Sequence, residues 1–482
     1  MATLKKNILY STILTTANYI FPLITYPYVS RILGVDKIGI CNFVDSIINY
    51  FILFSMLGIT TIGIREIAKN KNNKESLNAT FNSLFFLNTI TTTIMLILLI
   101  VAINTVPQLY KHNELMYFGT LKLIFNYLLV EWLYKGLEDF KFITNRTILI
   151  KCFYVISVFI FIHDKNDYKL YYLISSLMII INSIVNIIYS RKYVNYSLHN
   201  IHIKPFIKPF IIIGLYMLLT SMYTSFNVAY LGFVAGETEV GYYTTATKLY
   251  SIILSIFSAF TGVMLPRMSA LVTENKIDEF KMLLGKSFNL LFGFSIPIII
   301  FTIIFAHPII LLLSGKGYEG AVIPMQIVMP LILIIGYEQI LVIQTLIPLK
   351  KDKSILINSI IGACVGILSN ILLVSTYKST GSAIVWLISE ISVLTIAQFL
   401  VQKAIKISFP IKYLFKSILC NIPLGIILYL LHKFTEWNSI IIILYAIGIM
   451  AIYSFILQYY IMKNILFINI IDKYIHKIYH KA

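Results

Sequence analysis

The sequence predicts an all-α integral membrane protein, built as a two-lobed bundle of six plus six transmembrane helices with two additional C-terminal helices. Three observations predict this fold class. Of the 482 residues, 58% are hydrophobic and only 12% are charged, whereas soluble globular domains carry about 25% charged residues. Apolar runs of about 20 residues, long enough to cross a bilayer, recur along the chain. Two stretches that lie 202 positions apart also share one residue pattern.

Fourteen apolar runs are expected to be the membrane spans. The run at 287–313 contains Pro297 and His307-Pro308, which are expected to kink or break it. The approximate ranges are 8–32, 40–64, 80–104, 116–134, 147–162, 168–189, 210–234, 242–264, 287–313, 321–347, 354–374, 380–402, 413–431 and 439–462.

The internal repeat indicates two lobes. An offset of 202 maps the first predicted helix onto the seventh and the second onto the eighth. Because six helices per lobe is an even number, both lobes are expected to run the same way through the membrane, as in transporters whose substrate site lies between parallel repeats. Tyr28, Gly34, Gly39, Arg65 and Ala68 correspond in this way to Tyr230, Gly236, Gly241, Arg267 and Ala270.

The repeat also predicts the division of the chain. We expect an N-lobe with helices one to six at residues 1–190, a cytoplasmic interlobe linker at 191–209 and a C-lobe with helices seven to twelve at 210–402. Helices thirteen and fourteen and a cytoplasmic tail would then occupy 403–482.

The distribution of the net charge of +18 predicts the topology. With the N-terminus in the cytoplasm, 28 of the 39 Lys and Arg residues fall in inside loops. The positive-inside rule therefore places both termini in the cytoplasm. This topogenic excess explains the basic composition without a nucleic-acid partner. The seven outside residues are Lys37, Lys111, Lys165, Lys169, Lys316, Lys378 and Lys433.

Short loops argue against an enzyme. The largest outside loop, Thr105–Leu115, leaves no room for an extramembrane catalytic domain. The sequence has no GxxxxGK[ST] loop, and Gly315-Lys316-Gly317 is expected to be a short outside turn, where topology excludes an ATP site, so no nucleotide cofactor is predicted. The cysteines are scattered among the spans without CxxC spacing, and the sequence predicts neither a disulfide nor a metal site.

Four predicted helices carry polar side chains along one face. In hydrocarbon such faces turn toward other helices or a water-filled cavity. Because the four stripes occupy repeat-related positions, a hydrated central cavity is favoured over simple hydrogen bonding between helices. The stripes include Ser11, Thr15, Asn18 and Thr25; Asn42, Asp45, Ser46 and Asn49; Thr220, Thr224 and Asn227; and Thr244, Lys248, Ser251, Ser255 and Ser258.

Two interpretations of the charges inside these helices stay open. Asp45 and Lys248 could form a structural ion pair across the lobes, or Lys248 could bind an anion together with Arg31. Glu131 is either an interfacial carboxylate or, like Asp45, a candidate for ion coupling. Lys122 lies near a predicted helix end and is expected to snorkel toward the interface.

Several motifs resemble one family. Pro27-Tyr28-Val29-Ser30-Arg31-Ile32-Leu33-Gly34, followed by Gly39 and Arg65-Glu66-Ile67-Ala68, resembles the N-terminal signature of bacterial O-antigen and capsular polysaccharide flippases, the Wzx-type transporters of the MOP superfamily. Trp132-Leu133-Tyr134-Lys135-Gly136-Leu137-Glu138 is similar to their fourth-helix motif, where Gln is commoner than Lys135. The resemblance covers roughly residues 5–400.

The resemblance implies a MATE-like transporter and not an enzyme. Such a protein flips an undecaprenyl-pyrophosphate-linked oligosaccharide from the inner to the outer leaflet of the bacterial cytoplasmic membrane by alternating access. The transported units serve O-antigen, capsule or exopolysaccharide assembly. Arg31 and Lys248 become candidate pyrophosphate ligands, with Arg65 and Arg267 near the cytoplasmic mouth. Membrane lipids, a polysaccharide polymerase and a chain-length regulator are candidate partners. A MATE-like small-molecule exporter and, in a different class, a membrane-embedded polymerase or glycosyltransferase stay open as alternatives.

Overall fold

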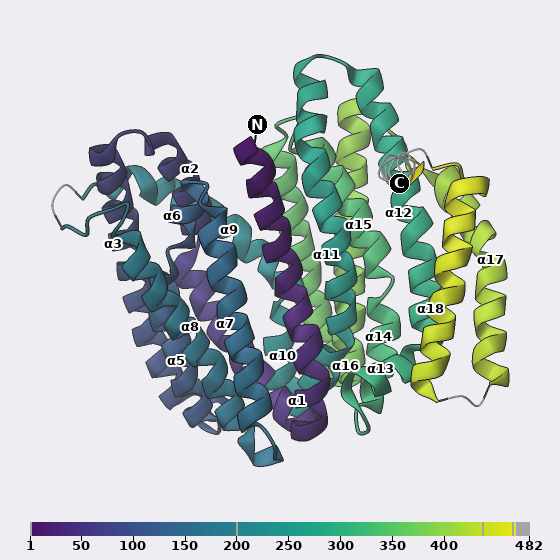
Figure 1. Cartoon of the computed structure of the whole chain (residues 1–482), viewed down its shortest axis with the longest axis horizontal. Helices are drawn as coiled ribbons and strands as arrows, with labels where there is room; N and C mark the ends of the chain where they lie inside the picture. The colour runs from purple at the N-terminus through teal and green to yellow at the C-terminus, as the bar shows by residue number, and fades with distance from the viewer. Residues whose placement is uncertain (1, 199–200, 436–437, 465–466, 469–482) are drawn as a thin grey trace, which may run out of the picture. The chain divides into compact units, whose positions relative to one another are not determined.

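A computed structural model of the chain describes residues 2–198, 201–435, 438–464 and 467–468, and these residues form helices and connecting segments without a β-strand (Figure 1). The chain divides into two compact units, Met1–Gly241 (unit 1) and Tyr242–Ala482 (unit 2). The lobe boundaries expected from the repeat stay a prediction.

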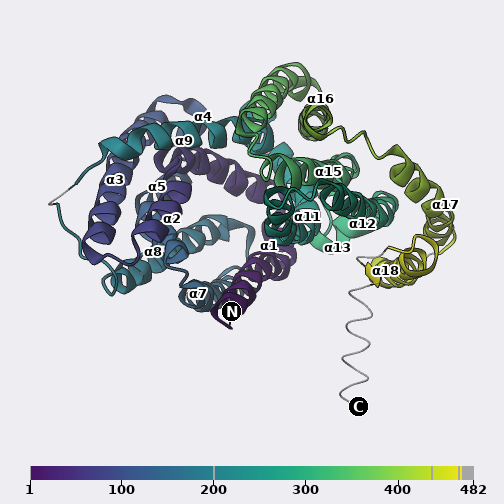
Figure 2. The same ribbon diagram turned by 90° about the horizontal axis from the view of Figure 1, so that it is seen from above.

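Unit 1 is a bundle of long helices joined by short turns (Figure 2). Its elements are α1 (Ala2–Met56), α2 (Ile59–Asn70), α3 (Lys74–Thr105), α4 (Pro107–Tyr110), α5 (Asn113–Asn126), η1 (Tyr127–Leu129), α6 (Glu131–Gly136), α7 (Phe140–Phe161), η2 (Lys165–Asp167), α8 (Tyr168–Ser190), α9 (Lys204–Thr224) and α10 (Phe226–Ala235).

Unit 2 holds most of α11 and all later elements, with α17 and α18 both packed on α12. The elements are α11 (Glu237–Thr273), α12 (Ile277–Ile304), α13 (Ala306–Ser314), η3 (Glu319–Ala321), α14 (Val322–Val328), α15 (Leu331–Leu341), the π-helix η4 (Val342–Leu346), α16 (Asp352–Ile405), α17 (Ile411–Phe434), α18 (Ser439–Ile456) and the π-helix η5 (Leu457–Ile461).

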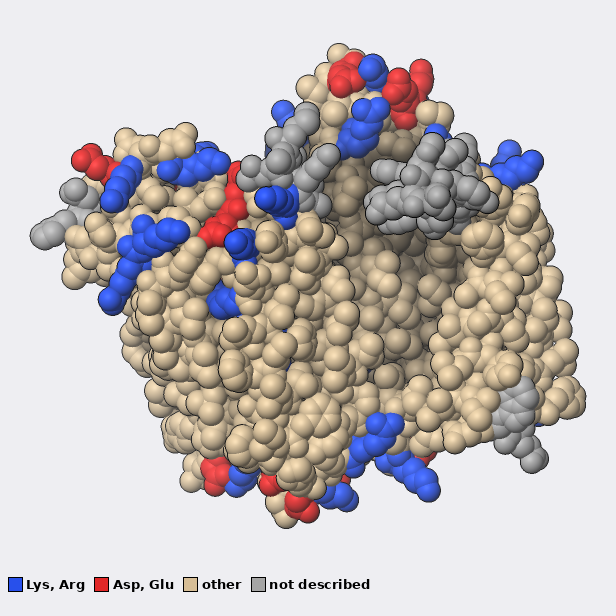
Figure 3. Space-filling view, viewed as in Figure 1, with Lys and Arg blue, Asp and Glu red and all other residues tan. Residues whose placement is uncertain are grey.

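The helices account for the predicted spans. In the part of the chain that the structure describes, 11 helical segments are long and apolar enough to cross a membrane. Two of these segments merge two helices across a kink, at Gly34 in α1 and at Lys378 in α16. With the halves counted separately and the shorter α5 added, they correspond to the fourteen apolar runs. Figure 3 shows Lys and Arg gathered toward the helix ends of unit 1, with a largely uncharged band between them.

The expected break in the run at 287–313 is confirmed beside His307-Pro308, because α12 ends at Ile304 and α13 begins at Ala306. At Pro297 the helix continues without a break, because a membrane helix tolerates a proline where its surroundings satisfy the freed carbonyl. The helix α9 begins at Lys204, inside the range 191–209 expected for the linker, and the bounds of the linker stay a prediction. Pro205 stands at the start of that helix, where the missing N–H has no partner to lose.

Two glycines confirm the internal repeat. Gly34 interrupts α1 with φ 73° and ψ 169°, and its repeat-mate Gly236 separates α10 from α11 with φ 88° and ψ 173°. Only glycine adopts this backbone conformation readily. The same break therefore recurs at the same place in each copy of the repeat.

The segments that follow the two glycines pack against each other within unit 1. A Cβ atom on Gly39 would lie 1.8 Å from the carbonyl oxygen of Glu237, and a Cβ atom on Gly241 would lie 2.4 Å from that of Val35. The two contacts are equivalent under the repeat, because Val35 corresponds to Glu237 and Gly39 corresponds to Gly241. Thr238 Oγ1 donates to Asp36 Oδ1 at 2.6 Å, again across one offset of 202. A local pseudo-twofold axis thus passes through this close crossing, the glycine crossing.

Gly39→Ala is expected to destabilise the protein by about 1–3 kcal/mol, because the added methyl group overlaps backbone that cannot move aside. The melting temperature of the detergent-purified protein measures this. Gly262→Ala in α11 is the matched control, since nothing lies within 4 Å of its Cβ position. Equal melting temperatures for the two variants would contradict the glycine crossing.

The predicted topology can be tested at four exposed lysines. In a cysteine-free background, a cysteine at Lys111 or Lys433 is expected to react with an impermeant maleimide in intact cells. A cysteine at Lys74 or Lys351 is expected to react only after the membrane is permeabilised, because the positive-inside rule puts these loops in the cytoplasm. The opposite labelling pattern would reverse the topology.

Candidate functional site

The predicted cavity residues lie on the two halves of α1 and on α11. Asn18, Arg31, Asn42, Asp45 and Asn49 belong to α1 in unit 1, where the side chains of Asn18, Arg31 and Asn49 are exposed. Arg31 Nη1 donates to the carbonyl of Pro27 at 2.8 Å. The remaining residues, Thr244, Lys248 and Ser251, belong to α11 in unit 2. A shared cavity between the lobes therefore stays a prediction.

Asp45 lies at the centre of a polar cluster inside unit 1. Its Oδ1 atom is 2.7 Å from Lys122 Nζ and accepts a hydrogen bond from the Tyr172 hydroxyl at 3.3 Å, while Asn49 Nδ2 donates to Oδ2 at 3.1 Å. The Lys122 ammonium also lies 4.0 Å from the centroid of the Tyr172 ring. The Lys122 side chain is 8% exposed and that of Asp45 is 38% exposed. The cation is thus buried, and its carboxylate partner faces partly outward.

The expectation that Lys122 snorkels was wrong. Its ammonium points into the bundle because Asp45 and the face of Tyr172 replace the hydration that the group loses. Asp45 therefore has a cationic partner in its own unit, and pairing with Lys248 is not needed to neutralise it. Sequence reasoning did not identify Lys122 and Tyr172 as partners of Asp45. The available signal was that an acidic and a basic residue, each isolated in an apolar run, tend to pair inside a membrane protein.

Glu131 belongs to a second charged cluster that joins α6, α7 and α8. Its Oε1 atom is 2.6 Å from Arg146 Nη2, and its Oε2 atom is 3.3 Å from Lys135 Nζ. Arg146 also donates to Thr147 Oγ1 at 3.1 Å and to the side-chain oxygen of Asn186. The carboxylate of Glu131 is thus held between two cations, and its role in ion coupling stays a prediction.

Arg146, which the sequence analysis counts among the 28 basic residues of inside loops, does not lie in a loop. It lies inside α7 with a side chain that is 3% exposed. The helix begins earlier than the apolar run suggested, because the Asp139 side chain accepts a hydrogen bond from Phe142 N–H and caps its N-terminus. A buried arginine needs the carboxylate that Glu131 supplies.

The two repeat-related arginines are exposed. Arg65 Nε lies 2.8 Å from Glu66 Oε1, and Arg267 Nη2 lies 3.9 Å from Glu279 Oε2. Exposed pairs of this kind contribute about 0–1 kcal/mol, so either guanidinium is free to exchange its partner for an anionic ligand.

Unit 2 buries the carboxylate of Glu390, which sequence reasoning did not include among the candidate site residues. Glu390 on α16 is 3% exposed, and its Oε1 atom accepts a hydrogen bond of 3.0 Å from Trp386 Nε1. The Trp386 ring packs edge-on against Tyr250, with ring centroids 4.9 Å apart.

A helical bundle with a kinked repeat and paired charges among its spans defines the class, a multi-pass membrane protein. Its fold is similar to a solved structure titled "Lipid II flippase MurJ, inward closed conformation", with a TM-score of 0.77, 18% identity and coverage of 94% of this chain and 99% of that one. It is also similar to an inward-facing multidrug resistance MATE family transporter of the MOP superfamily, with a TM-score of 0.63, 15% identity and coverage of 80% and 94%.

The chain belongs to the polysaccharide biosynthesis protein family, whose model matches residues 4–272. Two relatives carry the name "Putative O-antigen transporter". The protein from Escherichia coli (strain K12) is 27% identical over 399 residues, which cover 80% of this chain and 94% of the relative. The protein from Shigella dysenteriae is 27% identical over 398 residues, which cover 80% and 97%. The resemblance found in the sequence motifs is thereby confirmed for family and fold.

Proposed function

We propose that this protein flips an undecaprenyl-pyrophosphate-linked oligosaccharide from the inner to the outer leaflet of the bacterial cytoplasmic membrane, by alternating access, for the assembly of O-antigen, capsule or exopolysaccharide. The observation that carries the proposal is the combination of polysaccharide-family membership with a MOP-type fold. The relatives named as O-antigen transporters and the lipid II flippase support this substrate class.

The chemistry of the substrate requires a polar path. Each glycan hydroxyl that enters hydrocarbon without a hydrogen-bond partner costs several kcal/mol. On the two halves of α1, Asn18 and Asn49 are exposed and Asp45 is partly exposed, so amide and carboxylate groups are available to a glycan. A glycan can exchange water for such groups while its polyprenyl tail stays in lipid.

The anionic part of the substrate is assigned to the cations. In this proposal Arg31 and Lys248 bind the pyrophosphate, and Arg65 and Arg267 attract it to the cytoplasmic mouth. A diphosphate diester carries two negative charges, so its outward movement down an inside-negative potential releases about 2.3 kcal/mol per charge per 100 mV. The membrane potential alone could then bias the direction of transport.

Coupling to an ion is proposed at Asp45 or Glu131. Each carboxylate already shares its charge with a cation inside unit 1, at 2.7 Å from Lys122 and 2.6 Å from Arg146. Protonation of either carboxylate would release that cation and change the local charge. A polysaccharide polymerase and a chain-length regulator are the proposed protein partners, and the proposed location is the inner membrane with both termini in the cytoplasm.

Disruption of the gene separates the proposed function from its alternatives. A flippase predicts loss of surface polysaccharide and accumulation of single lipid-linked repeat units, both reversed by the wild-type gene. A polymerase predicts that single units still reach the cell surface without being joined. A small-molecule exporter predicts normal surface polysaccharide with altered sensitivity to toxic compounds, and this result would refute the proposal.

A further inference from the structure

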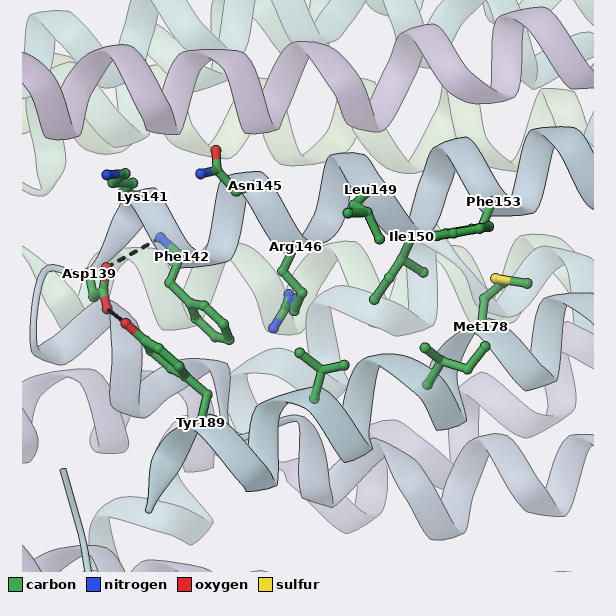
Figure 4. A pocket seen from close by; sticks show the side chains of 12 residues that line it. Asp139, Lys141, Phe142, Asn145, Arg146, Leu149, Ile150, Phe153, Met178 and Tyr189 are labelled. Carbon is green, nitrogen blue, oxygen red and sulfur yellow. Dashed lines mark hydrogen bonds between the residues drawn. The ribbon is translucent and has the colours of Figure 1, made fainter. Parts of the chain in front are cut away.

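A pocket of about 600 Å³ lies along α7 and α8 in unit 1 (Figure 4). One end is polar, with Asp139, Lys141, Asn145 and Arg146 in its wall. The rest is apolar and includes Leu149, Phe153 and Ile181. The change from polar to apolar follows α7 from its N-terminal end into the bundle.

The apolar part of the pocket opens on the side of the bundle that lipid would contact. Leu149 and Phe153 are each 57% exposed, and Ile181 is 44% exposed. From Lys141 to Phe153 the helix advances about 18 Å at 1.5 Å per residue. Half of the hydrocarbon core of a bilayer is about 15 Å thick. The groove therefore has the length of an acyl chain in one leaflet.

At the polar end of the pocket, the Asp139 carboxylate is already hydrogen-bonded, whereas Lys141 is available to a ligand. The Asp139 carboxylate accepts hydrogen bonds from Phe142 N–H, the Tyr189 hydroxyl and the Tyr193 hydroxyl at 3.3, 2.9 and 2.8 Å. Lys141 is exposed and takes part in none of the ion pairs found among the described residues.

An unsatisfied hydrogen-bond donor on Arg146 independently indicates that a ligand binds in this pocket. Its two terminal nitrogens bond to neighbouring side chains, but its Nε–H is buried without a hydrogen-bond partner. A buried donor left in this way costs free energy that an acceptor in the pocket would recover. In Figure 4 the Arg146 side chain projects from α7 toward α8, between the polar and the apolar ends.

We propose that this groove binds one anionic glycerophospholipid of the cytoplasmic leaflet. The phosphate lies at Lys141 and Asn145, the ester oxygens lie beside Arg146, and one acyl chain follows Leu149 and Phe153. The cytoplasmic leaflet follows from the predicted topology, which puts the basic N-terminal end of α7 inside. A phospholipid is favoured over the tail of a transported substrate, because the groove matches the depth of one leaflet.

Quenching by brominated lipid tests the proposal. Phe153→Trp places a reporter in the groove, and the signal of the parent protein is subtracted. The protein is reconstituted in phosphatidylcholine vesicles that contain increasing fractions of dibrominated phosphatidylglycerol or dibrominated phosphatidylcholine. Half-quenching is expected at an about fivefold lower fraction of the anionic lipid, the preference that one lysine near the membrane surface supplies.

Matched variants test whether the preference for the anionic lipid arises at Lys141 in this groove. Ile160→Trp at the other end of α7, where Ile160 is 57% exposed, is expected to show no preference. Lys141→Gln in the Phe153→Trp protein is expected to abolish it, Lys141→Arg to keep it, and Lys74→Gln, at another exposed lysine of unit 1, to leave it unchanged.

Three results would overturn the proposal. These are equal quenching by the two lipids at Phe153→Trp, a preference that survives Lys141→Gln, and relief of the quenching by small amounts of undecaprenyl phosphate, which would show that the groove holds a polyprenyl chain. Because gene disruption tests transport separately, failure here leaves the proposed function untouched.

Discussion

Asp45→Asn is expected to destabilise the protein by about 3–5 kcal/mol, because it leaves the buried ammonium of Lys122 without its carboxylate. The melting temperature of the purified protein measures the loss. Lys71→Gln is the matched control. It breaks the 3.1 Å pair between Lys71 and Glu138, whose side chains are 39% and 55% exposed, and is expected to cost about 0–1 kcal/mol.

The double variant Asp45→Asn with Lys122→Gln distinguishes a structural pair from a functional one. It removes both charges and is expected to recover most of the stability, since neither charge is then left unpaired. If surface polysaccharide returns as well, the pair serves only the fold, and ion coupling at Asp45 is refuted. If the protein is stable but inactive, the pair takes part in transport.

Arg31→Ala and Lys248→Ala are each expected to reduce surface polysaccharide about 10- to 100-fold while the protein inserts at normal levels. The size follows from loss of a hydrogen bond to a charged group, about 1.5–3 kcal/mol. Arg31→Lys and Lys248→Arg keep the charge and are expected to retain most activity. Immunoblots of membranes and quantification of surface polysaccharide provide the two readouts. Normal polysaccharide in both alanine variants would remove these residues from the pyrophosphate site.

The fold could be predicted from sequence because its determinants are local. Hydrophobic length specifies the spans, and Gly34 and Gly236 mark the repeat through a backbone conformation that other residues avoid. Of the two proline sites expected to interrupt the run at 287–313, only His307-Pro308 lies beside a break, because Pro297 is compatible with a continuous membrane helix.

The partners of the charged residues could be predicted only in part. Sequence showed that Asp45 was isolated in an apolar run, but not that α5 brings Lys122 to it across 77 positions. Arg146 was misplaced because hydropathy does not register the first turn of α7, where a capped helix begins among polar residues. Pairing across the bundle depends on helix packing, which a single sequence does not specify.

The leaflet that holds the lipid-linked oligosaccharide tests the central claim most directly. In a polymerase-deficient strain, glycan on the outer face of sealed spheroplasts can be oxidised by impermeant periodate, and glycan on the inner face only after lysis. We predict oxidation in intact spheroplasts that contain the wild-type protein, and oxidation only after lysis in those that lack it or carry Lys248→Ala. Equal oxidation in intact spheroplasts with and without the protein would contradict a flippase.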